Sequence, residues 1–323
     1  MNIDFSTPTW LVFHYHFVGT CSFILNSVVL YLVVFVSSKL DNFRYYLLCF
    51  QILCMLTDFY LTFLLQPIPL FPIIAGFCTG GIIILLMVSM MECLTLCFVR
   101  KHQGIAQIMH RHVINPIIIF LITLSTASGT ILSLVTFMLS GLGRDQQIEF
   151  VRENYPFYYT EFSSLLNFAI YEFNFIFKLI AVGCFIAVTL FAIFFSFLII
   201  DIFTLLAEVR RKISAKNFQR HQAAVISLVA QLATSSMCLL PPVGLVIAII
   251  SHYEHSQSKL SLKQIVVRIL LAIFALHSTV NASVLILTTP SYRGYIKRIF
   301  IRKRTRSTDS VWVSAGVHSM VKN

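Results

Sequence analysis

The sequence predicts an all-α membrane protein: a bundle of seven transmembrane helices with the N-terminus outside and a short interfacial helix after the seventh. Three observations predict this class. Seven long apolar runs contain no lysine or arginine. The composition is 58% hydrophobic and 11% charged, whereas soluble domains have about 45–50% and 25%. Finally, the basic residues between the runs are concentrated on alternate connections, which sets a direction across the bilayer.

Each apolar run is long enough for a helix of about 20 residues to cross a bilayer. Of the thirteen acidic residues, only Asp58 and Glu92 lie inside the runs. The connections are short, so we predict one seven-helix transmembrane domain over residues 1–289 and a basic cytoplasmic tail over residues 290–323. The predicted helices are 13–36, 45–66, 71–99, 113–139, 179–200, 223–250 and 269–289.

The distribution of lysine and arginine predicts the orientation. With the N-terminus outside, 18 of the 24 basic residues fall on the inner connections and the tail, and 6 fall on the outer connections. Short loops rich in basic residues face the cytoplasm. The formal net charge of +11 then lies where the anionic inner leaflet attracts it. The lipid bilayer is therefore the predicted partner of this charge, and we predict no nucleic-acid partner.

The cysteines and the sequence motifs predict no catalytic or metal centre. All eight cysteines lie in the apolar runs, so an extracellular disulfide framework is not expected. Cys93 and Cys97 are one helical turn apart; we favour small packing residues over a thiolate metal site, which would need more ligands. The chain has no His-Glu-x-x-His motif, paired intramembrane acids or nucleophile elbow. We therefore predict no metal, no cofactor and no enzymatic activity.

Asp58 is the residue that is most costly to place in the membrane. An ionised carboxylate at the bilayer centre costs about 2.5–3.5 kcal/mol on insertion scales, so Asp58 should face the bundle interior. At about 1.5 Å per residue, Asn26, Asp58 and Asn281 lie about 15, 20 and 12 Å from the cytoplasmic helix ends. We predict a polar cluster that links helices 1, 2 and 7. The alternatives are a packing role with local hydrogen bonds, and a proton or ion relay.

Two further features of the apolar runs predict a polar contact between helices and a bend within one helix. Glu92 lies about two turns from the inner end of helix 3 and is predicted to hold a polar contact between helices, either a switch or a static link. Pro241 and Pro242 remove backbone donors in the outer third of helix 6 and bend it. This bend is either a hinge or a fixed kink that shapes a cavity.

Aromatic and polar residues near the outer ends of several helices predict a mostly apolar pocket for a small organic ligand. The aromatic residues are so numerous that each has a lipid-facing or core position as its alternative. The candidate ligand-binding residues are Phe63, Gln66, Phe77, Cys78, Tyr171, Phe175 and His277.

The segment after helix 7 has the pattern of a membrane-surface helix. Apolar residues at helical spacing form one stripe, and basic residues lie between them. We predict that this helix anchors the tail at the inner leaflet, with contact to a signalling partner as the alternative. The stripe is Tyr292, Tyr295, Ile296, Ile299 and Phe300, and the basic flank is Arg293, Lys297, Arg298 and Arg302.

Four short segments, in order and on the expected helices, resemble the nematode serpentine chemoreceptors of the Str superfamily, most closely serpentine receptor class I. They are Leu56–Asp58, Gln66–Gly76, Cys97–Gln103 and Thr289–Arg293. The sequence departs from the rhodopsin-like pattern: no Asp/Glu-Arg-Tyr closes helix 3, no Asn-Pro-x-x-Tyr occurs in helix 7, and the second outer loop has no cysteine to pair with Cys78. Activation details of that class are therefore not carried over.

The resemblance implies a G-protein-coupled chemoreceptor of the plasma membrane, expected in chemosensory neurons, that binds a small environmental molecule and signals to a heterotrimeric G protein. The alternative is a small-solute transporter or channel, for which internal repeats and discontinuous helices would be expected. The basic inner surface is the predicted G-protein face, because its charge exceeds what orientation needs. Its residues are Arg100, Lys101, His102, Arg210, Arg211, Lys212 and Arg293.

Overall fold

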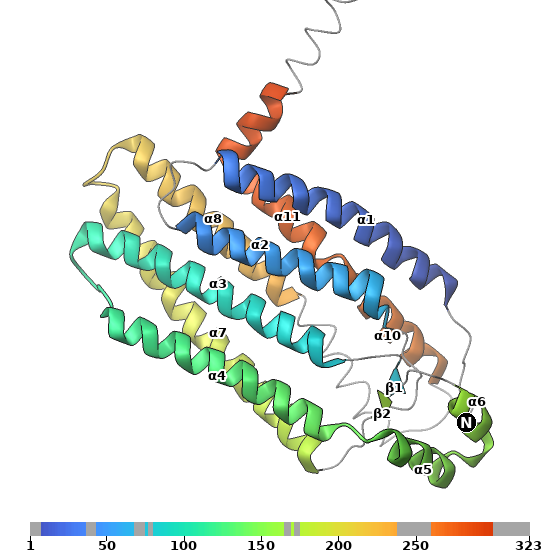
Figure 1. Ribbon diagram of the computed structural model, residues 1–323. Coiled ribbons are helices and arrows are strands. Elements are labelled where there is room, and N and C mark those ends of the chain that lie inside the picture. Colours follow the sequence, from blue (N-terminus) through green and yellow to red (C-terminus); the bar gives the residue numbers. More distant parts are fainter. Residues whose placement is uncertain are drawn as a thin grey trace, which may run out of the picture.

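Long helices lie side by side in one bundle in the computed structural model (Figure 1). The structure describes residues 8–36, 43–67, 75–76, 80–164, 169–170, 175–237 and 260–299. The bundle helices are α1 (Thr9–Tyr31, continued by the π-helical segment η1, Leu32–Val36), α2 (Phe43–Phe59, continued by the π-helical segment η2, Tyr60–Leu65), α3 (Gly80–Met109), α4 (Pro116–Ser140), α7 (Phe175–Val209), α8 (Ala215–Met237), α10 (Leu260–Ala275) and α11 (His277–Thr288).

We name the two ends of the bundle after the predicted orientation. The outer end holds the start of α1, and the inner end holds the turn between α3 and α4 (Figure 1). Two short strands at the outer end, β1 (Ala75–Gly76) and β2 (Ala169–Ile170), pair antiparallel. Beside them lie α5 (Arg144–Asn154), the 3-10 turn η3 (Pro156–Tyr158) and α6 (Tyr159–Ser164). The second outer connection is thus largely helical, which we did not predict.

Three helices extend well past their apolar runs at the inner end. α3 continues ten residues beyond Val99 to Met109, α7 continues to Val209, and α8 begins at Ala215, before the run that starts at residue 223. α3 ends where His110 adopts a left-handed backbone with φ 54°. α4 then begins at Pro116, where the Asn115 side chain accepts the Ile117 amide proton, an N-cap that satisfies one free backbone donor.

α3 occupies the centre of the bundle. It packs against α2, α4, α7 and α8, while α11 packs against α1, α8 and α2. The largest core cluster accordingly lies around the inner half of α3, where Leu94, Phe98 and Ile105 are fully buried. α4 and α7 leave most of their apolar side chains exposed. Such continuous exposed apolar surface is unsuited to water and belongs in lipid.

Six helices within the described residues are long and apolar enough to cross a membrane, which confirms the predicted all-α membrane class. They are Thr9–Val36, Phe43–Leu65, Gly81–Met109, Pro116–Leu139, Phe185–Val209 and Ile265–Thr288. The remaining predicted span, 223–250, is represented by the last part of α8, and its residues after Met237 lie outside the described part of the chain.

Residues 290–299 form a separate helix that leaves the direction of α11 (the red helix in Figure 1). Tyr292 is buried in a cluster with Val29 and Leu32 of the first helix, and the Tyr295 hydroxyl lies 3.0 Å from that of Tyr31. Ile299, in contrast, is half-exposed. The first residues of the predicted apolar stripe therefore pack against α1, and the last described one, Ile299, is exposed.

Candidate functional site

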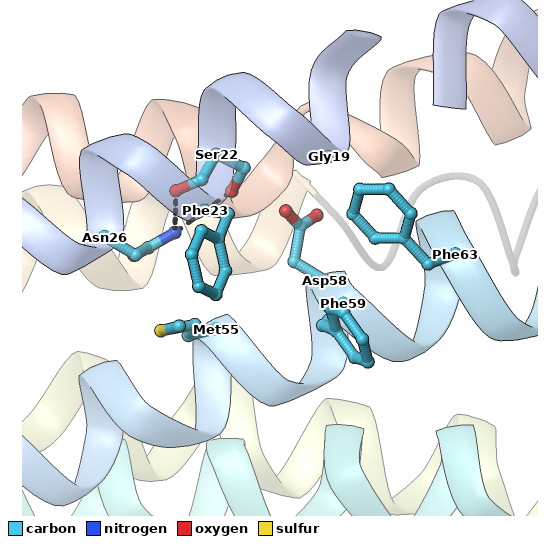
Figure 2. Close-up of a pocket in the computed structure, with 8 residues that line it drawn as sticks. All are labelled: Gly19, Ser22, Phe23, Asn26, Met55, Asp58, Phe59 and Phe63. Carbon is cyan, nitrogen blue, oxygen red and sulfur yellow. Dashed lines mark hydrogen bonds between the residues drawn. The ribbon is translucent and has the colours of Figure 1, made fainter. Parts of the chain in front are cut away.

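A buried acid lies between the first two helices. Asp58 sits near the end of α2, directly before the π-helical segment η2, and is 5% exposed. Its carboxylate points toward α1, between Ser22 and Phe63 (Figure 2). A side-chain hydrogen bond links it to Ser22. The carboxylate borders a crevice between α1 and α2 that is lined by Gly19, Ser22, Phe23, Asn26, Met55, Asp58, Phe59 and Phe63.

The links among helices 1, 2 and 7 are made by two asparagines. Asn26 Nδ2 donates to Ser22 Oγ at 3.0 Å and to Ser278 Oγ of α11 at 2.8 Å. Asn281 Nδ2 donates to Cys54 Sγ of α2 at 3.3 Å. Asp58 itself joins α2 to α1 through Ser22 rather than reaching Asn281 directly. The structure thus places the three predicted residues at the contacts of α1, α2 and α11, with Asn26 and Asn281 linking to or from α11; their action as one polar cluster stays a prediction.

Glu92 of α3 has its partner on α4. Its carboxylate accepts a hydrogen bond from the Thr130 hydroxyl, and Thr130 is 6% exposed. The contact joins the central helix to the most lipid-exposed one. Whether this link is a switch or a static contact stays a prediction. Pro241 and Pro242 lie outside the described residues.

The predicted pocket residues are only partly brought together. Gln66 Nε2 lies 3.2 Å from His16 Nε2, and the ring of Phe63 packs on the His16 ring with centroids 5.8 Å apart. His277 is buried at the start of α11, where its Nε2 has no hydrogen-bond partner among the described residues. Phe175 is exposed at the start of α7. Phe77, Cys78 and Tyr171 lie outside the described residues.

An acid that sequence reasoning missed organises the inner end. Asp201 of α7 accepts from two histidines: its Oδ2 lies 2.6 Å from His102 Nε2 of α3, and its Oδ1 lies 2.8 Å from His112 Nδ1. His112 belongs to the turn between α3 and α4 and has a left-handed φ of 57°. A non-glycine residue is strained in that region, so the contact with Asp201 helps to hold the turn. We call His102, His112 and Asp201 the inner clamp.

Lys101, which we placed on the G-protein face with His102, is likewise buried. Lys101 is 6% exposed and His102 is 3% exposed. Lys101 Nζ lies 3.1 Å from His221 Nδ1 of α8 and 5.5 Å from the centre of the Phe43 ring. Both side chains thus hold helices together, because the long α3 carries them between α7 and α8. Arg100 is exposed and lies over the Tyr46 ring.

The other predicted signalling residues are exposed. Arg210, Arg211 and Lys212 form the turn between α7 and α8, where the Arg210 guanidinium lies 5.9 Å from the centre of the Phe218 ring. Arg293 is also exposed, on the helix after α11. An exposed ion pair, Arg111 Nη1 to Glu208 Oε1 at 3.2 Å, lies beside the inner clamp.

The missed residues differ in how far the sequence indicated them. Asp201 directly follows a predicted helix that ends at residue 200, and an acid in that place is a signal that could have been matched to the histidines of the inner loop. His16 and Ser278 had no such signal, because polar residues inside apolar runs identify no partner by themselves. Thr130 is one of several hydroxyl residues of α4. The direction of the Thr130 hydroxyl toward Glu92 depends on how α4 is rotated about its own axis.

Within the described residues, no three histidine, cysteine or acidic side chains are placed to hold a metal ion. Cys54, Cys93 and Cys97 have buried thiols, and the Cys49 thiol is exposed. The Cys93 thiol donates to the Tyr46 carbonyl at 3.5 Å. The thiols between α2 and α3 thus act as small packing groups with weak hydrogen bonds.

Comparison with known proteins identifies the family. A search of curated proteins gave no match. A sequence model described as serpentine type 7TM GPCR chemoreceptor Sri matches residues 1–296. This match confirms the predicted seven-transmembrane fold and the resemblance carried by the four motifs, and the family is one of chemoreceptors rather than enzymes. The chain therefore belongs to the Sri family of serpentine seven-transmembrane chemoreceptors.

Proposed function

We propose that this chemoreceptor binds a small environmental molecule between the outer halves of its helices and activates a heterotrimeric G protein at its inner end, in the plasma membrane of a chemosensory neuron. The position of α3 supports the second part of this proposal, the activation of a G protein. This central helix packs against α2, α4, α7 and α8, and its inner end is tied to α7 by His102 and Asp201. A change in these polar contacts can shift the inner end of α3 against α7.

Exposed basic charge beside the inner clamp supports the G-protein contact. Arg210, Arg211 and Lys212 directly follow α7, the helix that carries Asp201. A shift of α7 therefore moves these side chains. Charged surface residues steer a partner of opposite charge and set its orientation. We therefore expect acidic residues on the G-protein surface that contacts this turn.

The test replaces Arg210, Arg211 and Lys212 together by glutamine. We expect weaker G-protein activation in a reporter cell, measured at matched surface expression and with agonist response compared to basal signal. The matched control replaces three basic residues of the outer end, Arg144, Arg152 and Lys178, by glutamine. Activation equal to wild type in the inner variant would make this turn a topological element and would refute its coupling role.

A further inference from the structure

The crevice between α1 and α2 has an excess of hydrogen-bond acceptors. The Asp58 carboxylate has the Ser22 side chain as its hydrogen-bonding partner. The Oδ1 atom of Asn26, which is fully buried and borders the same crevice, has no donor among the described residues. None of the eight lining residues is a lysine, arginine or histidine. A buried carboxylate and an unpaired amide oxygen are both costly in a membrane interior, so the crevice lacks a positively charged donor.

The rest of the lining is aromatic and apolar. Phe23 and Phe63 lie on the two sides of the carboxylate in the close-up, the Phe59 ring points away from it at the edge of the crevice, and Met55 lies one turn away on α2 (Figure 2). Phe23 is 47% exposed and Phe59 is 43% exposed, so the crevice borders the lipid-facing surface. Aromatic faces attract organic cations by their quadrupole, and a carboxylate adds an ion pair.

The backbone beside Asp58 departs from the α-helix. α2 changes to the π-helical segment η2 right after Phe59, and the Thr62 hydroxyl donates to the Asp58 carbonyl at 2.8 Å. The wider turn presents Phe63 toward α1, where its ring meets Gly19.

We propose that this crevice binds a small protonated alkylamine, with the ammonium group between Asp58 and Asn26 and the carbon chain against Phe23, Phe59 and Phe63. The inference rests on the proposed receptor function and names the ligand class. An ammonium donates to both acceptors and neutralises the carboxylate, whereas a neutral donor leaves the charge uncompensated. A bare inorganic cation would instead require several oxygen ligands around it, and the lining is mainly aromatic.

Binding requires the crevice to open. About 160 Å³ of space lies along its lining residues, part of it open to the outside, and no point in it is wide enough for a water molecule. Rotation of the half-exposed Phe23 and Phe59 side chains toward the lipid gives the ligand its space. The ligand then separates α1 from α2, and α2 packs directly on the central helix α3. Occupation of the crevice thus acts on the helix that carries His102.

The test measures thermal unfolding of the purified full chain in lipid nanodiscs with n-butylamine hydrochloride. The comparison compounds are n-butanol, which has the same chain without the charge, and sodium butyrate, which has the opposite charge. Sodium chloride at the same ionic strength is the blank. We expect a saturable rise in Tm with the amine alone. An equal rise with the alcohol, or with sodium chloride, overturns the proposal, because it assigns an apolar or an inorganic ligand.

Variants locate the site. Asp58→Asn should weaken the apparent affinity for butylamine about tenfold or more, since hydrogen bonds to charged groups contribute about 1.5–3 kcal/mol. Asp58→Glu keeps the charge and should restore part of the affinity, which separates recognition from a folding defect. Phe23→Leu should weaken binding, whereas the matched Phe17→Leu, a lipid-facing residue of α1 outside the crevice, should not. Glu92→Gln, the other intramembrane acid, should also keep the amine response.

Failure of this inference is distinguishable from failure of the proposed function. The Tm measurement requires no G protein. Amine stabilisation that depends on Asp58 supports the inference even if a reporter cell stays silent. Conversely, a reporter response to other compounds, with no Tm change by the amine, leaves the receptor function in place and overturns the ligand class.

Discussion

The Nε2 atom of His102 lies 2.6 Å from the Oδ2 atom of Asp201, and this pair joins the inner ends of α3 and α7. His102 is buried, whereas Asp201 is 30% exposed in its side chain and reaches the surface at the inner end of the bundle. His112 binds the second carboxylate oxygen at 2.8 Å. One acid therefore holds two helices and a strained turn, in a place where a G protein would dock. Removal of the Asp201 carboxylate should therefore weaken the contacts of α3, α7 and this turn together.

We predict that Asp201→Ala lowers stability and raises ligand-independent signalling. Removal of the carboxylate leaves the buried His102 imidazole without its acceptor, which costs about 1–3 kcal/mol. The free α3 end then favours the displaced arrangement. Thermal unfolding in detergent and basal reporter activity at matched surface level measure the two effects.

Arg111→Gln is the control for the inner clamp. It removes the neighbouring ion pair with Glu208, which is exposed on both sides. Such a pair contributes about 0–1 kcal/mol, so little change is expected. Basal activity of Asp201→Ala that matches both wild type and this control would mean that the clamp has no part in signalling.

A second prediction concerns the link between α3 and α4. Thr130→Val keeps the volume of the side chain but removes the hydroxyl that donates to Glu92. The loss of a buried partner should cost about 1–3 kcal/mol, seen as a lower Tm. Thr136→Val is the matched control, because that hydroxyl donates to the Leu132 carbonyl of its own helix. Equal effects of the two substitutions would argue against a stabilising contact between the helices.

Close contact between α1 and α2 leads to a third prediction. A Cβ atom on Gly19 would lie 2.4 Å from Thr62 Oγ1 and 2.8 Å from Phe63 Cε2. Gly19→Ala should therefore force the helices apart and destabilise the bundle by about 1–3 kcal/mol. Gly183→Ala in α7 meets nothing within 4 Å, and its better helix propensity should raise stability by up to about 1 kcal/mol. We expect Tm to fall in Gly19→Ala and to rise in Gly183→Ala. An unchanged Tm in Gly19→Ala would show that α1 and α2 are packed less closely than these distances indicate.

Topology gives the fourth prediction. A tag at Asn2 should be detected on intact cells, whereas a tag after Lys322 should require permeabilised cells. The reason is the concentration of 18 of the 24 basic residues on the inner connections and the tail. Both tags on the same side of the membrane would contradict the seven-span topology.

Much of the fold was predictable because its causes are local in the chain. Apolar runs and basic connections each lie within one segment, so their number and order can be read directly. The ends of the helices were less predictable. α3 continues through the polar residues after Val99 to Met109, and α7 continues past Asp201 to Val209, because contacts with neighbouring helices stabilise turns beyond the uncharged runs.

The candidate site was predictable by residue type but not by contact. Asp58, Asn26 and Asn281 stand out as polar residues in apolar runs, and the structure places all three among α1, α2 and α11. Their partners Ser22, Ser278 and Cys54 carry no comparable signal. Lys101 and His102 show the opposite case, since basic residues at a helix end predicted an exposed face and the structure buries them.

The sequence by itself determined the membrane class, the number of spans and the family, because burial in lipid and the short motifs depend on stretches of adjacent residues. Only the tertiary structure decided which polar side chains meet. His102 and Asp201 are 99 residues apart in the chain, and their contact depends on how α3 and α7 are rotated about their axes. That rotation is hidden in the sequence, because a helix that is apolar on every side presents no hydrophobic contrast between its lipid face and its protein face.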